Sequence, residues 1–340
     1  MGALSMLALV LGGGGVLLSA VWVAVDGLKK QNIRPGLVGL IMVSVGLVLP
    51  LESDPGRAST VPSVTADPGP ITNSVNLSTS PTLVARLGIA CKTDFEGRAN
   101  CWGSDVPLPE GPVHKVVLGR AHGCALLQTG ELSCWGDLPD TAGGHAGHRF
   151  VDVASTLHTT CGLTAQGALH CFGRDLGMPP SGHRLKQITG GADHFCALTE
   201  TKHAFCWGRD TDGQLGVPEG ERFHRLSAGH FHSCGITLEG RTACWGRDAE
   251  GQSSPPPNQA FAKLSLGWAH SCGLVEGGKA VCWGCGGRHA RLQVGAAQAC
   301  SPPPDPFIAL TSGDLWQSCG LSEDGDVQCW GGIQRQGESG

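Results

Sequence analysis

Seven pairs of cysteines recur along this chain of 340 residues, and the two members of each pair are ten residues apart. Successive pairs begin 33 to 47 residues apart. A period of this length is typical of proteins whose units bury a continuous core by stacking on their neighbours, and it fits one blade of a β-propeller. The spacing therefore predicts an all-β fold with seven blades. The pairs are Cys91 and Cys101, Cys124 and Cys134, Cys161 and Cys171, Cys196 and Cys206, Cys234 and Cys244, Cys272 and Cys282, and Cys319 and Cys329.

Within each repeat the residues follow the pattern of short β-strands. An alternating segment such as FHRLSAG (223–229) comes first, and two further strands follow, each with one cysteine of the pair. In six repeats the residues after the first cysteine are small and then apolar, as expected of a strand covered on both faces, whereas the first repeat has Lys92 and Thr93 there. In six repeats the turn between the last two strands contains glycine, as at Gly240, which permits the positive φ of a hairpin loop. The fourth repeat has Lys202 there.

The predicted hairpins place the two cysteines of each pair opposite one another. Directly opposed residues of antiparallel strands lie about 4.5–5.5 Å apart at Cα, and a disulfide needs about 4.4–6.8 Å. We therefore expect seven cross-strand disulfides. The alternative is seven pairs of reduced, buried cysteines that pack as small apolar residues. Sixteen cysteines in one chain favour an oxidising compartment over the cytosol.

The sixth repeat departs from the pattern because it carries additional cysteines. The stretch CWGC at 282–285 is a C-x-x-C motif, His289 follows it, and Cys300 ends the insertion. A zinc site formed by Cys282, Cys285, His289 and Cys300 is one interpretation. A thioredoxin-like site would need a βαβ context, which is absent. Because Cys282 already has Cys272 as its hairpin partner, we expect Cys285 and Cys300 to form an eighth disulfide.

Aromatic and histidine residues also recur at fixed places. A metal ring is one interpretation of the histidines two residues before the first cysteine, but they lie on different blades with no carboxylate at a fixed offset. We expect them to bond to the backbone of the neighbouring blade, and the aromatic residues after the second cysteine to pack between blades. The histidines are His122, His194, His232 and His270, and the aromatic residues are Trp102, Trp135, Phe172, Trp207, Trp245, Trp283 and Trp330. His230 does not recur and receives no assignment.

The first fifty residues contain two apolar runs separated by a basic loop. Residues 3–25 are long enough to span a bilayer, which takes about 20 residues, whereas 36–51 is marginal. The basic loop should stay in the cytoplasm. Either both runs form a helical membrane hairpin, or the second is a signal peptide cleaved near Ala58; we favour retention because no clean cleavage site follows. Both interpretations place the C-terminal region outside the cytoplasm.

A segment rich in proline, serine and threonine follows at 52–82, which is typical of a disordered linker. The predicted organisation is therefore a membrane or signal region at 1–51, a linker at 52–82 and a propeller at 83–340.

The pattern H-x-C-A-L…G…C-W-G, followed in WGRDTDGQLG (207–216) by a Gly-Gln-Leu-Gly tail, resembles the regulator of chromosome condensation repeat. The resemblance covers 83–340 and implies a seven-bladed propeller. The paired-cysteine form looks like that of secreted or surface-associated bacterial members. The family includes a nucleotide-exchange factor for a small GTPase, a plant ultraviolet-B photoreceptor and a secreted bacterial inhibitor of β-lactamases. What the resemblance implies in common is protein binding through loops on one face.

We therefore predict a monomeric, disulfide-stapled propeller outside the cytoplasm, anchored in the membrane or released by cleavage, that binds an unidentified protein partner. The loops at 284–306 and 137–149 are the expected contact surface. A propeller that binds carbohydrate or cell wall is the alternative, and an enzyme is a third possibility. No G-x-S-x-G, H-E-x-x-H or phosphate loop is present, so we expect no catalytic residue, cofactor or metal. The net charge of −5 argues against nucleic acid as a partner.

Overall fold

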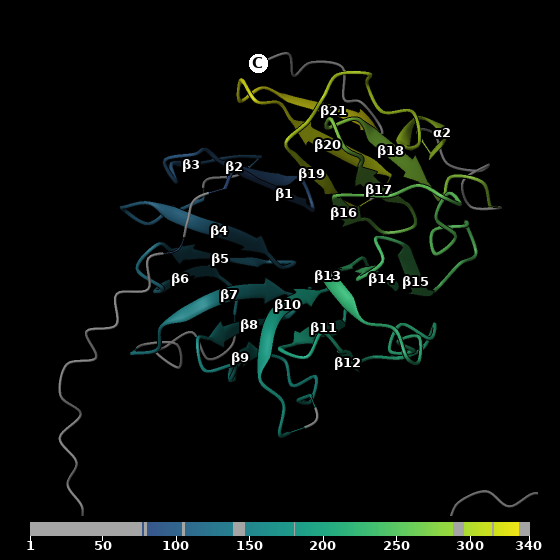
Figure 1. Cartoon of the computed structure of the whole chain (residues 1–340). Helices are drawn as coiled ribbons and strands as arrows, with labels where there is room; N and C mark the ends of the chain where they lie inside the picture. Colours follow the sequence, from purple (N-terminus) through teal and green to yellow (C-terminus); the bar gives the residue numbers. More distant parts are fainter. Residues whose placement is uncertain are drawn as a thin grey trace, which may run out of the picture. The chain divides into compact units, whose positions relative to one another are not determined.

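The computed structural model describes residues 77, 80–103, 106–138, 147–179, 181–287, 296–314 and 316–332, which all belong to the unit Pro68–Gly340. Over these ranges the chain folds into seven antiparallel sheets of three strands each (Figure 1). Each sheet is one uninterrupted stretch of chain and corresponds to one cysteine repeat. The predicted all-β fold with seven blades is therefore confirmed, and we number the blades 1 to 7 in chain order.

The strands of the first four blades have the following bounds. Blade 1 comprises β1 (Thr82–Arg86), β2 (Ile89–Thr93) and β3 (Ala99–Trp102); blade 2 comprises β4 (Val113–Leu118), β5 (His122–Leu127) and β6 (Leu132–Gly136); blade 3 comprises β7 (Phe150–Ser155), β8 (Thr159–Thr164) and β9 (Leu169–Gly173); and blade 4 comprises β10 (Leu185–Gly190), β11 (His194–Thr199) and β12 (Ala204–Gly208).

The remaining three blades follow the same order. Blade 5 comprises β13 (Phe223–Ala228), β14 (His232–Thr237) and β15 (Thr242–Gly246); blade 6 comprises β16 (Lys263–Leu266), β17 (Ser271–Leu274) and β18 (Ala280–Trp283); and blade 7 comprises β19 (Ala309–Ser312), β20 (Gln317–Leu321) and β21 (Val327–Gly331). A single-turn helix, α2 (Ala296–Ala299), lies in the segment between blades 6 and 7.

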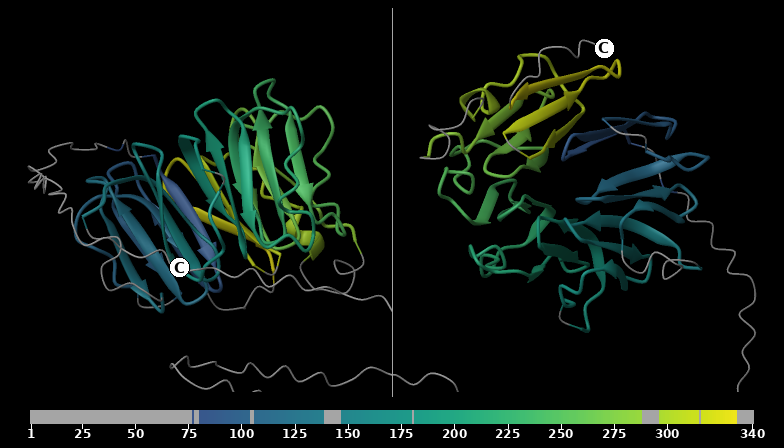
Figure 2. Two further views of the ribbon diagram at one scale, coloured as in Figure 1. Left: turned by 90° about the horizontal axis from the view of Figure 1, so that it is seen from below. Right: turned by 180° about the vertical axis from the view of Figure 1, so that it is seen from behind.

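The first strand of every blade contacts the first strand of the next, and the ring is closed by β1 against β19 (Figure 2). Over the described ranges, no sheet combines strands from blade 1 with strands from blade 7. The seam between blades 7 and 1 is made by hydrogen bonds instead: Ala85 N donates to Thr311 Oγ1 (3.0 Å), and Lys92 Nζ donates to the carbonyl of Gly325 (2.7 Å). Blade 1 has the most divergent sequence, and side-chain hydrogen bonds attach it to blade 7 where the ring closes.

The middle strands are buried on both faces, because each blade is sandwiched between two neighbours. β8, β11 and β14 are buried along their whole length. Glycine after the first cysteine makes room for a phenylalanine of the first strand: a Cβ on Gly235 would lie 2.3 Å from the ring of Phe223. Gly162, Gly273 and Gly320 face Phe150, Phe261 and Phe307 in the same way. Where alanine stands instead, at Ala125 and Ala197, the first strand begins with the smaller Val113 and Leu185.

The start of the packed chain differs from the predicted boundary at residue 83. β1 begins at Thr82, and Leu77 packs against the core of blades 2 and 3. Both apolar runs, 3–25 and 36–51, and the linker up to residue 76 lie outside the described residues, and so does the predicted helical structure of that region. In the part of the chain that the structure describes, no helix is long and apolar enough to cross a membrane.

Lys202 has the left-handed backbone conformation that its turn requires, with φ of 69°, where the other blades use glycine. A side chain with a Cβ is strained there. We expect Lys202→Gly to raise the free energy of unfolding by about 0.5–1 kcal/mol, since glycine relieves the strain but adds freedom to the unfolded chain. The reverse change in blade 5, Gly240→Lys, should lower the free energy of unfolding by a similar amount. A Cβ on Gly240 would meet no neighbouring atom, so the only cost is the strain of the backbone conformation, with φ of 79°. Thermal melts of the two variants check the pair, and equal melting temperatures would contradict it.

Candidate functional site

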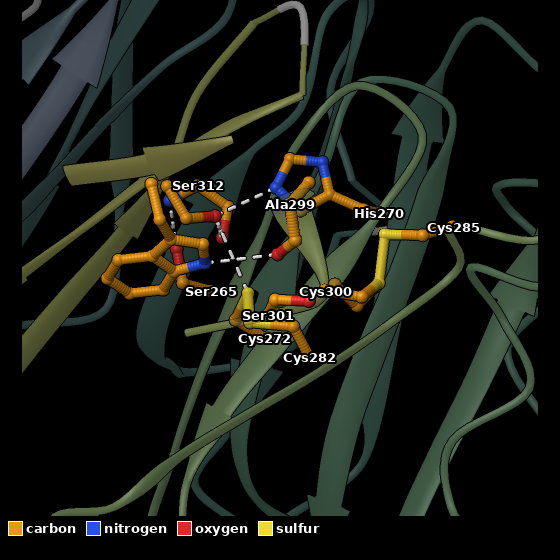
Figure 3. Close-up of a disulfide and its surroundings, with 12 residues drawn as sticks. Ser265, His270, Cys272, Cys282, Cys285, Ala299, Cys300, Ser301 and Ser312 are labelled. Atoms are coloured by element: carbon orange, nitrogen blue, oxygen red, sulfur yellow. Dashed lines mark hydrogen bonds between the residues drawn. A yellow bond between two sulfur atoms is a disulfide. The ribbon is translucent and has the colours of Figure 1, made fainter. Parts of the chain in front are cut away.

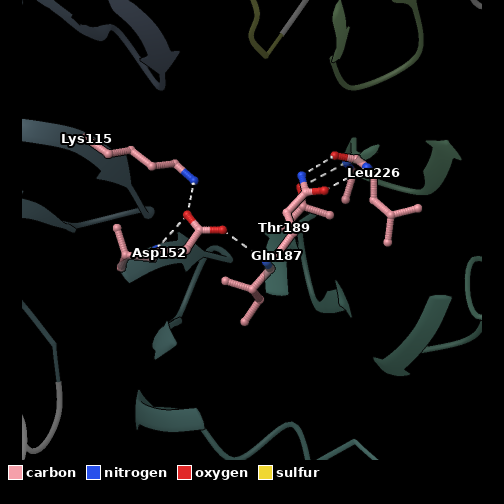
Figure 4. Close-up of polar contacts among 8 residues, drawn as sticks. Lys115, Asp152, Gln187, Thr189 and Leu226 are labelled. Carbon is pink, nitrogen blue, oxygen red and sulfur yellow. Dashed lines mark hydrogen bonds and ion pairs between the residues drawn. The ribbon is translucent and has the colours of Figure 1, made fainter. Parts of the chain in front are cut away.

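Side chains from the preceding blade close the inner edges of blades 4 and 5. A first strand at the edge of a sheet leaves N–H groups without a strand partner. Asp152 Oδ2 accepts a hydrogen bond from Ile188 N (3.1 Å), while its Oδ1 accepts one from Lys115 Nζ (2.8 Å) (Figure 4). Gln187 Oε1 accepts one from Leu226 N (3.0 Å). Each of these bonds crosses a blade boundary, so the polar side chains of the first strands fix the angle between neighbouring blades.

The four recurring histidines form a second set of contacts across blade boundaries. Each Nε2 lies within hydrogen-bond distance of the hydroxyl that stands directly before the first cysteine of the next blade. The pairs are His122 and Thr160 (2.9 Å), His194 and Ser233 (2.9 Å), His232 and Ser271 (2.8 Å), and His270 and Ser318 (2.8 Å). The prediction of a contact with the neighbouring blade was correct, but the partner is a side-chain hydroxyl and not the backbone. The reason is that the strand backbone at this place is already paired within its own sheet.

At the remaining three blade boundaries, both the histidine and the hydroxyl are absent. Between blades 3 and 4, Thr159 stands at the histidine position and Phe195 at the hydroxyl position. These two positions hold Gln317 and Ala90 between blades 7 and 1, and Ile89 and Gly123 between blades 1 and 2. A hydroxyl therefore stands before the cysteine only where the preceding blade supplies a histidine. This dependence within one chain is the signal from which the contact could have been found.

Burial keeps these histidines neutral. All four are buried, and His194, His232 and His270 have no exposed surface. Desolvation is the main cause that lowers the pKa to about 4 in His122, His194 and His270 and to about 3 in His232. A neutral imidazole beside a hydroxyl is a structural contact and not a general acid or base at neutral pH.

The face at which first strands end carries a ring of backbone hydrogen bonds, and we call it the girdle face. It consists of the loops 87–88, 119–121, 156–158, 191–193, 229–231, 267–270 and 313–316, of which residue 315 is not described. The opposite face, with the hairpin turns inside each cysteine pair, is the turn face. The bonds of the ring run from Arg120 N to Leu157 O (2.8 Å), Leu157 N to Ala192 O (2.8 Å), Ala192 N to His230 O (3.3 Å), His230 N to Gly267 O (3.0 Å) and Trp268 N to Gly313 O (3.3 Å).

A cluster of charged side chains joins distant blades at the centre of the girdle face. Arg86 of blade 1 donates to the carbonyls of Leu118 in blade 2 (3.1 Å) and Gly191 in blade 4 (3.3 Å). Asp314 of blade 7 accepts from Leu87 N (2.7 Å), and its Oδ1 lies 2.5 Å from His230 Nε2 of blade 5. The side chains of His230 and Asp314 are only 12% and 10% exposed. This axial cluster of Arg86, His230 and Asp314 thus ties five of the seven blades together.

The electrostatics of the axial cluster depend on all three members. Desolvation lowers the pKa of Arg86, and the charge of Asp314 acts against that effect. Burial alone would raise the pKa of Asp314. The hydrogen bond and charge of His230, the N–H of Leu87 and the charge of Arg86 hold it below its usual value instead. Asp314 is therefore a carboxylate whose charge compensates a buried guanidinium.

An aromatic patch lies beside the axial cluster on the girdle face. Phe231 of blade 5, Trp268 of blade 6 and Trp316 of blade 7 follow one another, with ring centroids 6.4 Å and 6.1 Å apart. Trp316 is 1% exposed, whereas Phe231 and Trp268 are partly exposed. The guanidinium carbon of Arg247 lies 5.8 Å from the centroid of the Phe231 ring. Partly exposed aromatic and arginine side chains of this kind are common at the centres of protein interfaces.

All sixteen cysteines lie among the described residues, and they form eight disulfides with no free cysteine. Seven join the hairpin pairs, whose members face one another in the strand register with Cα atoms 4.0 Å apart. The eighth joins Cys285 and Cys300, with Cα atoms 6.0 Å apart. Since Cys282 is bonded to Cys272, the cysteines of the alternative zinc site are all in disulfides, and His289 lies outside the described residues.

The disulfide between Cys285 and Cys300, which we call the clasp, lies next to α2, and α2 contacts β21 of blade 7 (Figure 3). The carbonyl of Ala299 accepts a hydrogen bond from Trp330 Nε1 (3.0 Å), and Cys285 packs with Ala299, Trp268 and Trp316 in one apolar cluster. The predicted contact loop at 284–306 therefore begins beside the aromatic patch, although 288–295 are not described.

The other predicted contact loop, 137–149, is described only at its ends. Asp137 lines a depression of about 480 Å³ on the girdle face together with His158, Gly173 and Arg174. Residues 139–146 lie outside the described ranges. Over those ranges no group of three or more histidine, cysteine, aspartate or glutamate side chains is arranged to hold a metal ion. The structure therefore offers contact surfaces, and the candidate functional site is the girdle face.

Comparison with a family model matches the regulator of chromosome condensation (RCC1) repeat at residues 113–137, 185–214, 223–252 and 261–289. Four of the seven blades of this chain thus match the RCC1 repeat. The matched stretches lie in blades 2, 4, 5 and 6, which have the most regular sequences, and they confirm the resemblance that the motifs indicated. Comparison with curated protein sequences finds no match.

Solved structures of similar fold include receptor ectodomains. The ectodomain of the receptor kinase CR4 from Physcomitrella patens has a TM-score of 0.62 and 26% identity over 75% of this chain and 73% of that chain. The CRINKLY WD40 ectodomain of the receptor kinase ACR4 from Arabidopsis thaliana has a TM-score of 0.60 and 22% identity over 75% and 97%. Prp20p from Saccharomyces cerevisiae, studied for its binding to Gsp1p and histones, has a TM-score of 0.55 and 17% identity over 74% and 82%. The last two similarities establish the fold alone.

The axial cluster and the aromatic patch were not found from the sequence. Phe231, Trp268 and Trp316 all lie in loops between the first and second strands, and Trp268 and Trp316 are the two propeller tryptophans outside the Cys-Trp-Gly positions. The loop that they share was a usable signal, although their offsets from the first cysteine differ by one residue. Arg86 lies within β1, whereas His230 and Asp314 lie in loops after first strands, so no common place in the repeat links these three residues.

Proposed function

We propose that this chain is a propeller that works outside the cytoplasm and binds a protein partner through its girdle face, without catalysis. The observation that carries the proposal is that all sixteen cysteines are paired. Such a set of disulfides is maintained in oxidising compartments and is lost to thiol reductants in the cytosol. The apolar run at 3–25, which we propose as a membrane anchor, agrees with that location. The similarity to the CR4 ectodomain, at 26% identity, supports the same view.

The direction of the chain favours the girdle face as the contact surface. β1 begins at the turn face, where Thr82 N donates to Thr93 Oγ1 next to the first hairpin turn. The described chain therefore enters blade 1 at the turn face, and the loops of the girdle face lie at the other ends of the strands. The partly exposed Phe231, Trp268 and Arg247 supply the anchors that such an interface needs.

The thiol count tests the location. We expect the full chain, isolated without reductant and unfolded in guanidinium, to show no free thiol among its sixteen cysteines. After reduction the same assay should count sixteen, which serves as the internal control. A count near sixteen free thiols before reduction would contradict a location in an oxidising compartment, because only a reducing compartment keeps so many thiols free.

Cross-linking of the full chain in its native host tests the contact surface. The partner cross-linked to the unaltered chain should be lost from the Phe231→Ala/Trp268→Ala variant, with affinity reduced at least about tenfold, as for truncation of interface anchors. The matched control is Phe95→Ala, which removes an aromatic ring that is 57% exposed on the turn face. Loss of the partner with the control variant, and not with the other, would contradict the girdle face.

A carbohydrate ligand is the second candidate, and the partly exposed ring of Trp268 on the girdle face is the observation that favours it. Sugar rings stack on aromatic faces. Binding of the full chain to a defined polysaccharide panel, abolished by Trp268→Ala alone, would favour this candidate over a protein partner.

A further inference from the structure

The clasp differs from the seven hairpin disulfides in what holds its two halves together. The hairpin cysteines are opposed in strand register, so the strands keep their sulfurs adjacent even without the bond. Cys285 follows β18, and the adjacent Gly286 N donates to the carbonyl of Glu250 in the segment after blade 5 (3.3 Å). Cys300 N donates within its own turn, to the carbonyl of Ala297 (3.3 Å). Among the described residues no strand pairing joins the segments of Cys285 and Cys300, so the clasp re-forms less readily than a hairpin bond.

The clasp is also the one disulfide of the eight in which neither cysteine is buried. Both of its cysteines are partly exposed. In every hairpin pair the first cysteine is at most 3% exposed. A thiolate must reach a sulfur along the axis of the bond, and exposed disulfides are the ones that react readily in exchange.

Two other blades show what the clasp replaces. Trp245 Nε1 donates to the carbonyl of Gln214 (2.9 Å), and Trp283 Nε1 donates to that of Gln252 (3.0 Å). The acceptor precedes its tryptophan by 31 residues in both, and Ala299 precedes Trp330 by the same number. The two glutamines are buried, and their Oε1 atoms accept from the backbone N of Asp212 (2.7 Å) and Glu250 (2.8 Å), which fixes the loop.

Ala299 has no amide side chain with which to fix its loop in this way. The adjacent Cys300 is bonded to Cys285 instead. In the segments after blades 4 and 5, a glutamine hydrogen bond holds the carbonyl that accepts from the tryptophan of the next blade. In the segment after blade 6, the disulfide Cys285–Cys300 has this role, and a reductant can break it.

We propose that Cys285–Cys300 is a redox-sensitive clasp, which a dithiol reductant opens while the seven hairpin disulfides stay closed, and whose opening releases α2 from Trp330. One thiolate of the reductant attacks a clasp sulfur, the S–S bond breaks, and the leaving cysteine thiolate takes up a proton. The second thiol of the reductant, as its thiolate, then resolves the mixed disulfide, and the other cysteine thiolate is protonated. The reductant ends as a disulfide, and the clasp as two thiols, with two electrons transferred.

Opening of the clasp acts on the girdle face. α2 and Cys285 pack against Trp316 and Trp268, so release of the helix removes the support of two members of the aromatic patch. This effect on partner binding rests on the proposed function, whereas the opening itself does not.

Graded reduction tests the selectivity of the clasp. The full chain is equilibrated with increasing dithiothreitol, alkylated, and analysed by peptide mass spectrometry for label on each cysteine. We expect Cys285 and Cys300 to be half-labelled at a dithiothreitol concentration at least about tenfold below that of any hairpin pair. Cys319–Cys329 is the strictest comparison, because Cys329 is itself exposed and lies in the adjacent blade. Hairpin pairs that open at the same concentration would overturn the proposal.

The indole N–H signals of tryptophan test what opening releases. In indole-¹⁵N-labelled full chain, the signal of Trp330 should shift and exchange faster with solvent on mild reduction and in Cys285→Ser/Cys300→Ser. Trp245 and Trp283 are references in the same spectrum and should stay unchanged, as should Trp330 in the control variant Cys234→Ser/Cys244→Ser. An unchanged Trp330 signal with the clasp open would overturn the proposal. A shifted signal with unaltered partner binding would support the clasp and contradict the girdle face as the contact surface.

Discussion

Acidification from pH 7 towards pH 4 should destabilise the folded propeller steeply. The pKa of His122, His194 and His270 is lowered by burial to about 4, and that of His232 to about 3, against about 6.5 in the unfolded chain. Below pH 6.5 the unfolded chain therefore binds more protons than the folded one. The stability is fully present above pH 6.5 and falls as the pH drops towards 4, by up to about 1.4 kcal/mol per pH unit for each histidine.

The measurement is the free energy of unfolding in denaturant between pH 7.5 and 4.5, with the disulfides intact. Replacing one histidine should remove about one quarter of the slope, and His232→Gln is the suitable change because blade 7 has Gln317 at that place. The matched control is His224→Gln, which alters an exposed histidine of the same blade and should leave the slope unchanged. A flat dependence on pH in the unaltered chain would contradict the role of the buried histidines.

Loss of the Asp314 carboxylate should be the most damaging single substitution that we consider. Asp314→Ala leaves the buried guanidinium of Arg86 without a counter-charge and removes the acceptor of Leu87 N at the seam between blades 7 and 1. We expect the free energy of unfolding to fall by about 3–5 kcal/mol, the usual cost of leaving one charge of a buried, interacting set without compensation. Asp324→Ala in the exposed turn of the same blade is the control and should change it by less than about 0.5 kcal/mol.

A double variant separates the charge effect from simple loss of packing. Adding Arg86→Met to Asp314→Ala removes the uncompensated charge, so part of the lost stability should return. Denaturant unfolding of the four proteins gives the coupling free energy. If the two losses simply add, the axial cluster does not act as an electrostatic unit.

The repeat allowed the sequence to predict more of the fold than of the site. The ten-residue spacing within each cysteine pair set the hairpins and their register, because a period-two strand pattern permits few ways to oppose two cysteines. The same argument extended to the pairing of Cys285 with Cys300, since every other cysteine already had a partner. These inferences are local, and local geometry is what a single sequence encodes most directly.

The site depends on contacts between blades, which the spacing within a blade does not determine. The repeat pattern predicts that His232 contacts the next blade, but its partner Ser271 belongs to another sheet, and the spacing within one sheet does not determine which atoms of two sheets meet. Arg86 and Asp314 are 228 residues apart and meet only because the ring closes. Trp268 lies outside the Cys-Trp-Gly positions, so the repeat pattern gives it no role.

The arrangement of the blades has a consequence for how such a chain can be made. A chain with sixteen cysteines has a very large number of possible pairings, and secreted proteins with long-range disulfides must sort them after synthesis. Here seven of the eight bonds close within eleven consecutive residues of a single blade, and the eighth closes within sixteen. Because the chain is synthesised from its N-terminus, each hairpin is complete before the next cysteine pair is available to compete for its sulfurs. The repeat that builds the ring thus also orders its own oxidative folding.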